Sequence, residues 1–394
     1  MLQAGRNMTR MHIATLQLAN FRNHASLTLE CDHRHVVLTG DNGAGKTNIL
    51  EAVSLLSPGR GLRRASLENI ARNGGNGTWS VFAAMQGAAG PVTIGTGIID
   101  TALGPETQRR VRINSAPAKS ADDLLEHSRI VWLTPAMDGL FTGPPSDRRK
   151  FLDRLVLAID PAHGRRAADF EKAMRARNRL LGEASPDGAW LDAIEAQMVE
   201  SGVAIALARL ELVSLLSAVI VQSATLASPF PDALLGLDGS LENLGHDMAS
   251  IDLEDGYRER LRASRRLDAG AGRTLEGPHR SDLKVMHRPK AMTAGLCSTG
   301  EQKALLVAIL LAHAKLVSDL AGFAPILVLD EIAAHLDEQR RAALFDRIDA
   351  LQCQAIMTGT DRQLFAAMAD RAQYFEITAG KAVKEHDEFE QRGN

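Results

Sequence analysis

The sequence predicts an α/β protein, built as a nucleotide-binding head with a helical segment inserted into it. Three features of the chain lead to this expectation. A glycine-rich loop follows a short apolar run near the start, two carboxylates close a second apolar run far downstream, and a long helical pattern lies between them. In α/β folds, buried parallel strands are nearly continuous apolar runs, and ligands bind beyond their carboxyl ends. The 394 residues are enough for two or three domains.

The glycine-rich loop has the composition of a phosphate-binding loop. Residues 36–38 are expected to form the strand before it, and a helix is expected from Asn48 onward. Glycines allow backbone N–H groups to surround the phosphates with no Cβ in the way. In such a loop Lys46 would reach the β- and γ-phosphates and Thr47 would ligate Mg²⁺. The sequence therefore predicts an ATP site at Gly40, Asp41, Asn42, Gly43, Ala44, Gly45, Lys46, Thr47 and Asn48.

The second motif, residues 325–331, is an apolar strand that ends in two carboxylates. Asp330 fits a second Mg²⁺-binding position, and Glu331 fits a general base that orients the attacking water. Alone, the pair would more often be a solvated Asp-Glu that opens a turn. Its position after a buried strand favours the catalytic interpretation.

A third motif, Ser298-Thr299-Gly300-Glu301-Gln302, matches an ABC-type signature and precedes a helical pattern. By itself it could be an N-cap before a core helix. A free helix N-terminus with a serine and a close-approach glycine also suits a γ-phosphate. Because the signature lies far along the chain from the loop, we expect an ATP-dependent homodimer in which it acts in trans. The residues expected to act across the dimer are Ser298, Gly300 and Gln302, with Asp337 in the D-loop that follows.

Composition is consistent with a reduced, intracellular protein. The net charge of −3 does not by itself indicate a nucleic-acid partner. The three cysteines are widely spaced, which argues against a disulfide framework, and the N-terminus lacks an apolar secretion core. The stretch from Leu212 to Pro231 is uncharged and long enough to span a membrane, but its serines, glutamine and prolines predict a packed helix instead. We expect a cytoplasmic protein with no membrane contact.

Domain organisation follows from the distance in sequence between Lys46 and Asp330, which is too large for one uninterrupted nucleotide-binding domain. The chain between them reads first as strands, then as helices over residues 145–227, and then as a loop-rich, strongly charged stretch over residues 228–274. We expect an ATP-binding head from residues 1–120 and 275–394, and a helical arm, or lid, domain from residues 121–274. The expected strands of the head are residues 79–83, 92–95 and 110–114.

Four blocks of sequence together resemble the RecF family, bacterial recombination mediators built on an SMC-like ABC ATPase head. They are Asn20-Phe21-Arg22-Asn23, the phosphate loop with Leu50-Glu51-Ala52, Arg148-Arg149-Lys150-Phe151-Leu152-Asp153, and Gly277-Pro278-His279-Arg280-Ser281-Asp282-Leu283. The resemblance runs from about Leu16 to Thr360. Generic ABC or SMC heads share only the nucleotide motifs, so the third and fourth blocks are the more specific ones.

The resemblance implies a P-loop ABC/SMC-type ATPase head that binds ATP, Mg²⁺ and DNA at gaps and single-strand/double-strand junctions. It also implies that RecR, with RecO, is a partner in loading RecA. ATP hydrolysis would be weak and DNA-dependent, used as a switch rather than as a metabolic reaction. Residues 358–361 contain no switch histidine, which agrees with slow hydrolysis.

Basic clusters are the candidates for DNA contact. Arg60, Arg63 and Arg64 follow the loop helix, and two further clusters lie at residues 109–112 and 148–150. Each could instead be a solvated face, but together they could follow a phosphate backbone.

Two alternatives share the nucleotide motifs. Another SMC-like DNA repair ATPase head would have a longer coiled coil or an added nuclease domain. A transporter ATPase subunit would lack the long helical insertion and would usually carry a switch histidine.

Overall fold

The computed structural model describes residues 10–87, 90–101, 104–105, 108–223, 229–245 and 248–385. These residues fall into two units. One draws on Met1–Asp138, Ala227–Phe230 and Leu310–Asn394, and is called the head unit below. The other draws on Gly139–Leu226 and Pro231–Ile309, and is called the helical unit.

The centre of the head unit is a six-stranded sheet in the order β10-β14-β15-β3-β16-β17. Its first five strands are parallel and only β17 is antiparallel. The strands are β3 (His35–Thr39), β10 (Ile130–Leu133), β14 (Ile326–Leu329), β15 (Ala355–Thr358), β16 (Ala372–Thr378) and β17 (Lys381–Lys384). All residues of β3, β10, β14 and β15 are buried, which is why their sequences are continuous apolar runs.

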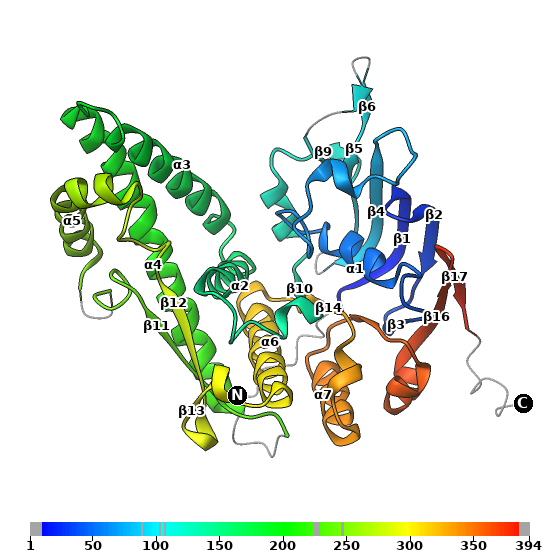
Figure 1. Cartoon of the computed structure of the whole chain (residues 1–394). Coiled ribbons are helices and arrows are strands. Elements are labelled where there is room, and N and C mark those ends of the chain that lie inside the picture. Colours follow the sequence, from blue (N-terminus) through cyan, green and yellow to red (C-terminus); the bar gives the residue numbers. More distant parts are fainter. Residues whose placement is uncertain are drawn as a thin grey trace, which may run out of the picture. The chain divides into compact units, whose positions relative to one another are not determined.

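A second, antiparallel sheet of the head unit has the order β2-β1-β4-β5-β8-β9 (Figure 1). Its strands are β1 (His12–Phe21), β2 (His24–Glu30), β4 (Trp79–Gly87), β5 (Gly90–Ile98), β8 (Arg110–Ile113) and β9 (Ala116–Pro117). A separate pair joins β6 (Asp100–Thr101) to β7 (Gly104–Pro105). The strands predicted near residues 79, 92 and 110 are confirmed. Alternate side chains of β4 are buried, as expected of a sheet with one covered face.

Helix α1 (Lys46–Ser54) follows β3 directly, and α7 (Glu338–Ala350) follows β14 after a short turn. Helix α6 (Thr299–Ala321) begins in the helical unit and ends in the head unit. Both α1 and α6 confirm helices that the sequence predicts. The 3-10 turns are Leu67–Ile70, Ala121–Glu126, Pro135–Met137, Arg288–Lys290, Ala294–Leu296, Ile332–His335 and Arg362–Arg371.

The helical unit contains four complete helices and a three-stranded sheet in the order β11-β12-β13. These elements are α2 (Pro145–Leu157), α3 (His163–Leu181), α4 (Gly188–Ser223), α5 (Ser250–Ala271), β11 (Ala233–Asp238), β12 (Asp282–His287) and β13 (Met292–Thr293). Helices α3 and α4 lie side by side, as Figure 1 shows, and α5 completes their apolar core. The helical pattern predicted from residue 145 is confirmed.

The expectation that residues 228–274 are loop-rich is wrong. They contain β11 and the 22-residue helix α5. Leu253, Tyr257 and Leu261 recur every four residues and are buried, so the helix has an apolar stripe. The many charged residues between them hid this stripe in the sequence.

The boundaries of the two units also differ from the expected domains. Residues 275–309, expected in the head, lie in the helical unit, and residues 121–138, expected in the arm, lie in the head unit. The reason is that β12 pairs with β11, which joins residues 282–287 to the helical unit. Division of the chain into an ATPase head and a lid domain stays a prediction.

Two helices, α4 and α6, are apolar enough to span a membrane by length and composition alone. In the structure, half of the apolar window of α4 and 72% of that of α6 are buried within the fold. Leu212, Val213, Leu216 and Ile220 in the uncharged stretch all lie inside the helical unit. Packing within the fold therefore covers most of the apolar window of α6 and half of that of α4.

An arginine, Arg177, lies at the centre of the helical unit with none of its side chain exposed. Its guanidinium donates to Glu195 of α4 at 2.8 Å and to Asp268 of α5 at 2.6 Å. It also donates to Thr274 at 3.0 Å and to the Leu261 carbonyl at 2.8 Å. This network ties α3, α4 and α5 together, and it satisfies charges that would be costly to bury unpaired.

We therefore expect Arg177→Met to destabilise the protein by about 3–5 kcal/mol, because two buried carboxylates lose a partner. The matched control is Arg179→Met on the same helix, where the side chain is exposed and the cost should stay within about 0.5 kcal/mol. Urea unfolding followed by circular dichroism measures both free energies. Equal stability of the two variants would contradict the structural role given to Arg177.

Candidate nucleotide site

The loop between β3 and α1 has the backbone geometry of an anion cradle. Gly40, Gly43 and Gly45 have φ values of 126°, 84° and 115°, which side-chain-bearing residues rarely adopt. A Cβ at position 40 would lie 2.4 Å from the Ile377 carbonyl oxygen, and one at 45 would lie 2.7 Å from the Asn23 amide. Glycine is therefore required at both ends of the loop, and α1 begins immediately after it.

Lys46 is folded back over this loop. Its Nζ donates to the carbonyl oxygens of Gly40 at 2.5 Å and Asp41 at 2.9 Å. Burial lowers the pKa of Lys46, although the carboxylates of Glu331, Asp330 and Asp41 oppose this shift. The ammonium group is thus held where the loop converges, and both of its partners are backbone carbonyls that a phosphate could replace.

Asp330, at the end of β14, accepts hydrogen bonds from the phosphate loop and from the end of β15. Thr47 Oγ1 donates to Asp330 Oδ1 at 3.1 Å across a separation of 283 residues. Thr358, at the end of β15, donates its hydroxyl to the same oxygen at 2.7 Å and accepts a hydrogen bond from the Glu331 N–H at 2.9 Å. Asp330 is only 6% exposed. The structure therefore brings together the predicted residues Lys46, Thr47, Asp330 and Glu331 at one edge of the parallel sheet.

The backbone of Glu331 has φ 50° and ψ 29°, a left-handed conformation. Non-glycine residues hold this conformation mainly where the surrounding structure imposes it. Here the imposed constraint is the hydrogen bond from the Glu331 N–H to Thr358, which turns the chain immediately after Asp330. The Glu331 side chain is partly exposed, so it remains available to a water molecule.

The Asn20–Asn23 block of sequence supports the loop from the β1–β2 turn. Asn23 Nδ2 donates to the Ala44 carbonyl at 3.0 Å, and Asn48 Nδ2 donates to Asn23 Oδ1 at 2.6 Å. The ring of His24, fully buried, lies with its nitrogens 3.3 Å from the Gly45 carbonyl and 2.8 Å from the Gly380 carbonyl. This block therefore fixes the shape of the phosphate loop.

Glu51, on α1, is a fully buried carboxylate with two arginine partners. Arg22 donates to its two oxygens at 2.6 and 2.8 Å, and Arg63 donates to it at 3.0 Å and to Asn48 at 2.6 Å. Arg63 is a predicted DNA contact. In this structure its guanidinium is hydrogen-bonded to the helix that follows the loop. Arg60, Arg63 and Arg64 are all exposed, and 39% of the Arg63 side chain is accessible.

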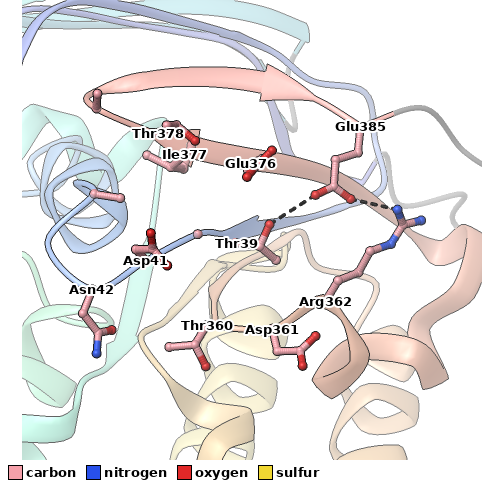
Figure 2. A pocket seen from close by; sticks show the side chains of 13 residues that line it. Thr39, Asp41, Asn42, Thr360, Asp361, Arg362, Glu376, Ile377, Thr378 and Glu385 are labelled. Atoms are coloured by element: carbon pink, nitrogen blue, oxygen red, sulfur yellow. Dashed lines mark hydrogen bonds and ion pairs between the residues drawn. The ribbon is translucent and has the colours of Figure 1, made fainter.

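A pocket of about 490 Å³ opens beside the loop, within the usual size range of small-molecule sites. Figure 2 shows Arg362 directed at Glu385, which also faces Thr39. The Arg362–Glu385 contact is 2.8 Å and the Thr39–Glu385 contact is 3.4 Å. The other lining residues are Gly40, Asp41, Asn42, Ala44, Thr360, Asp361, Glu376, Ile377, Thr378 and Ala379. The phosphate loop is thus bordered by a polar cavity of ligand size.

The signature residues lie in the helical unit, at the start of α6. Ser298 is exposed, and its hydroxyl donates to Glu301 at 3.0 Å. Hydrogen bonds from Lys290 and Ser298 hold the pKa of Glu301 at about 2. A Cβ added at Gly300 would meet no described atom within 4 Å. Packing within the chain therefore does not explain the glycine, whereas the approach of an external group would.

Two predicted site residues have local partners instead. Gln302 is buried, and its side chain donates to the Cys297 carbonyl at 2.8 Å, so it braces the signature from within. Asp337 caps α7 by accepting a hydrogen bond from the Arg340 N–H at 2.8 Å. Their roles across a dimer stay predictions.

In the other two predicted basic clusters, Arg109, Arg148 and Arg149 have structural partners. Arg109 donates to the carbonyls of Ser57 and Gly59, and burial lowers its pKa to about 10. Arg148 forms a two-point ion pair with Asp282 at 2.7 and 3.1 Å, and Arg149 donates to the Ser281 carbonyl. The bonds of Arg148 and Arg149 join residues 148–153 to residues 277–283. These two guanidinium groups are therefore not free basic groups.

Sequence reasoning missed Thr358, Arg22 and His24 as parts of the site. Thr358 could have been found from its place at the end of a buried strand, next to the loop that lacks a switch histidine. No signal in the sequence pairs Arg22 with Glu51, because the bond depends on how the turn between β1 and β2 packs against α1.

Comparison with known proteins agrees with this geometry. The RecF/RecN/SMC N-terminal domain model matches residues 12–383. The DNA replication and repair protein RecF of Rhizobium etli is 60% identical over 373 residues, covering 94% of this chain and 98% of that protein. RecF of Mesorhizobium japonicum is 58% identical over 370 residues, covering 94% of this chain and 97% of that protein.

Solved structures show the same fold. The recombination mediator RecF–ATP of the RecFOR pathway superposes with a TM-score of 0.83 at 23% identity, over 96% of this chain and 98% of that one. An Smc head domain with an extended coiled coil from Pyrococcus furiosus gives a TM-score of 0.53 at 16% identity, over 97% and 98%. The α/β ATPase-head fold predicted from the sequence is confirmed. The chain belongs to the RecF family of DNA replication and repair proteins.

Proposed function

We propose that this chain is an ATP-dependent DNA-binding recombination mediator that acts at gaps and single-strand/double-strand junctions in the cytoplasm. In this role it helps RecO and RecR to load RecA, and it uses slow ATP hydrolysis as a switch. The observation that carries the proposal is the hydrogen bond from Thr47, in the phosphate loop, to Asp330 at the end of β14. Membership of the RecF family supports DNA repair as the setting.

ATP would bind at the phosphate loop, with its phosphates in the cradle of Gly40–Lys46 backbone N–H groups. The loop's Lys46 would exchange its two carbonyl partners for phosphate oxygens. Among the described residues no group of three or more His, Cys, Asp or Glu is placed to hold a metal. Mg²⁺ bound through phosphates needs only one or two protein oxygens, and Thr47 and Asp330 supply a hydroxyl and a carboxylate in contact.

Hydrolysis requires a group that orients water against the γ-phosphate. Glu331 suits this role because it follows Asp330, is partly exposed and has a backbone held in place by Thr358. The exposed Ser298 and the uncrowded Gly300 suit the same phosphate from a partner subunit. ATP would thereby link two copies of the chain.

Of the alternatives, another SMC-like repair ATPase head is expected to have a longer coiled coil or an added nuclease domain, and the longest helix of the described arm is the 36-residue α4. A transporter subunit receives no support from the relatives compared, because RecF proteins are 58–60% identical to this chain over 94% of its length. DNA contact by Arg60, Arg63 and Arg64 remains part of the proposal, since all three are exposed.

The proposal is tested by binding to a gapped duplex and to a blunt duplex of equal length, with ATP or ADP. We expect tighter binding to the gapped substrate, with ATP only, and an affinity that falls steeply as salt rises because phosphate contacts dominate. Fluorescence anisotropy measures each affinity. Equal binding of both substrates, or no effect of ATP, would overturn the proposed role.

Glu331→Gln should slow ATP hydrolysis by about a hundredfold or more while ATP still binds, because the water loses its general base. Glu338→Gln, an exposed carboxylate in the first turn of α7, is the control and should hydrolyse ATP at the normal rate. Single-turnover phosphate release and nucleotide binding are measured together. Rapid turnover by the Glu331 variant would place the base elsewhere.

The shared site is tested by mixing two inactive variants, Lys46→Ala and Ser298→Arg. In a mixed dimer one site receives an intact loop and an intact signature, so phosphate release should reappear, provided the two sites need not fire together. The control mixes Lys46→Ala with the Lys46→Ala/Ser298→Arg double variant, in which no intact pair can form. A flat baseline in both mixtures, with mixed dimers confirmed by mass, would refute a site shared between chains.

A further inference from the structure

The exposed face of α3 carries an unusual concentration of positive charge. The helix has six basic and two acidic residues between His163 and Leu181. Lys172, Arg175 and Arg179 are all exposed and follow one another at steps of three and four residues, so they lie on one side of the helix. This group is called the α3 stripe below. The buried residues Phe170, Ala173, Arg177 and Leu180 form the opposite side.

Within the part of the chain that the structure describes, the three side chains of the α3 stripe have no hydrogen-bond or ion-pair partner. The neighbouring helix α5 is equally rich in arginine, but four of its five arginines, all except Arg266, form ion pairs. Its Arg262 and Arg265 bind Asp192, and Arg265 also binds Glu195. The α3 stripe therefore differs from α5 in that three successive cations on one side of the helix have no ion-pair partner among the described residues.

We propose that the α3 stripe contacts the phosphate backbone of DNA. This inference rests on the DNA binding proposed above and assigns part of it to the helical unit. The three cations extend along about 10 Å of helix. One strand of a duplex presents a phosphate every ~3.4 Å along its axis, so several phosphates lie within reach of the stripe. Cations aligned along a straight helix match a ligand with charge repeated along a line.

A nucleic acid fits this surface better than a protein does. Protein interfaces centre on apolar and aromatic anchors. None of the exposed large hydrophobic residues of the described chain lies on α3. The absence of exposed aromatic residues on α3 also favours the backbone over the bases, which bind by stacking.

The stripe is presented by a rigid support. Phe170 and Leu180 anchor α3 in the apolar core, and Arg177 is fixed by Glu195 and Asp268. The stripe side chains are long and exposed, so they can reach phosphate oxygens. Binding should therefore need no refolding of the helix, and replacement of the stripe should leave the fold intact.

The test compares two triple variants that remove the same number of charges from the helical unit. Lys172→Gln/Arg175→Gln/Arg179→Gln alters the stripe. Its matched control is Arg266→Gln/Arg273→Gln/Arg288→Gln. These three arginines lie outside α3, are exposed and have no side-chain partner among the described residues. Affinity for a gapped duplex is measured with ATP over a range of salt concentrations. Thermal unfolding confirms that both variants fold.

We expect the stripe variant to bind at least tenfold more weakly and to lose about one unit of log–log salt slope for each phosphate contact removed. The control variant should keep both the affinity and the slope of the unaltered protein. Equal losses in the two variants would mean that only overall charge matters, and would overturn the assignment. Unchanged binding by the stripe variant would overturn it while leaving the proposed function standing. Failure of the unaltered protein to bind DNA would overturn both.

Discussion

The Asp330 carboxylate is the contact on which the rest of the candidate site depends. It is nearly buried, so it needs hydrogen-bond donors, and it takes them from Thr47 and Thr358. These two hydroxyls stand at the ends of the loop and of β15. Because β15 lies between β14 and β3 in the sheet, the three groups can meet only if the strands keep this order and register. The Thr358 hydroxyl also accepts a hydrogen bond from the Glu331 N–H. One hydroxyl therefore positions both Asp330 and Glu331.

Several arginines of this protein hold segments together through ion pairs with buried carboxylates. Arg22 and Arg63 hold the buried Glu51 beneath the loop, and Arg177 holds the helices of the other unit together. Arg209 does similar work by binding Asp153 and the Pro278 carbonyl. Bidentate, always-charged guanidinium suits such buried positions better than lysine. It follows that a run of arginines in the sequence says little about binding until its partners are known.

The sequence blocks at residues 148–153 and 277–283 gain a physical explanation. Arg148 and Asp282, one from each block, form an ion pair in which both side chains are largely buried. Together with Arg209 they fix α2, α4 and the start of β12 in one arrangement. After β12 the chain passes through two 3-10 turns and β13 before it reaches the signature at the start of α6.

The sequence by itself determined the nucleotide motifs, the buried strands and the helical insertion, because each depends on local patterns of glycine, apolar and acidic residues. It could not reveal the helix α5, whose apolar stripe is masked by charge, or the extension of the helical unit to residue 309, which follows from pairing between distant strands. The difference between Arg63, bound to Glu51, and Arg179, open to solvent, was likewise decided only by tertiary structure. Composition shows that a charge is present, but only the arrangement of distant segments decides whether another part of the chain neutralises it.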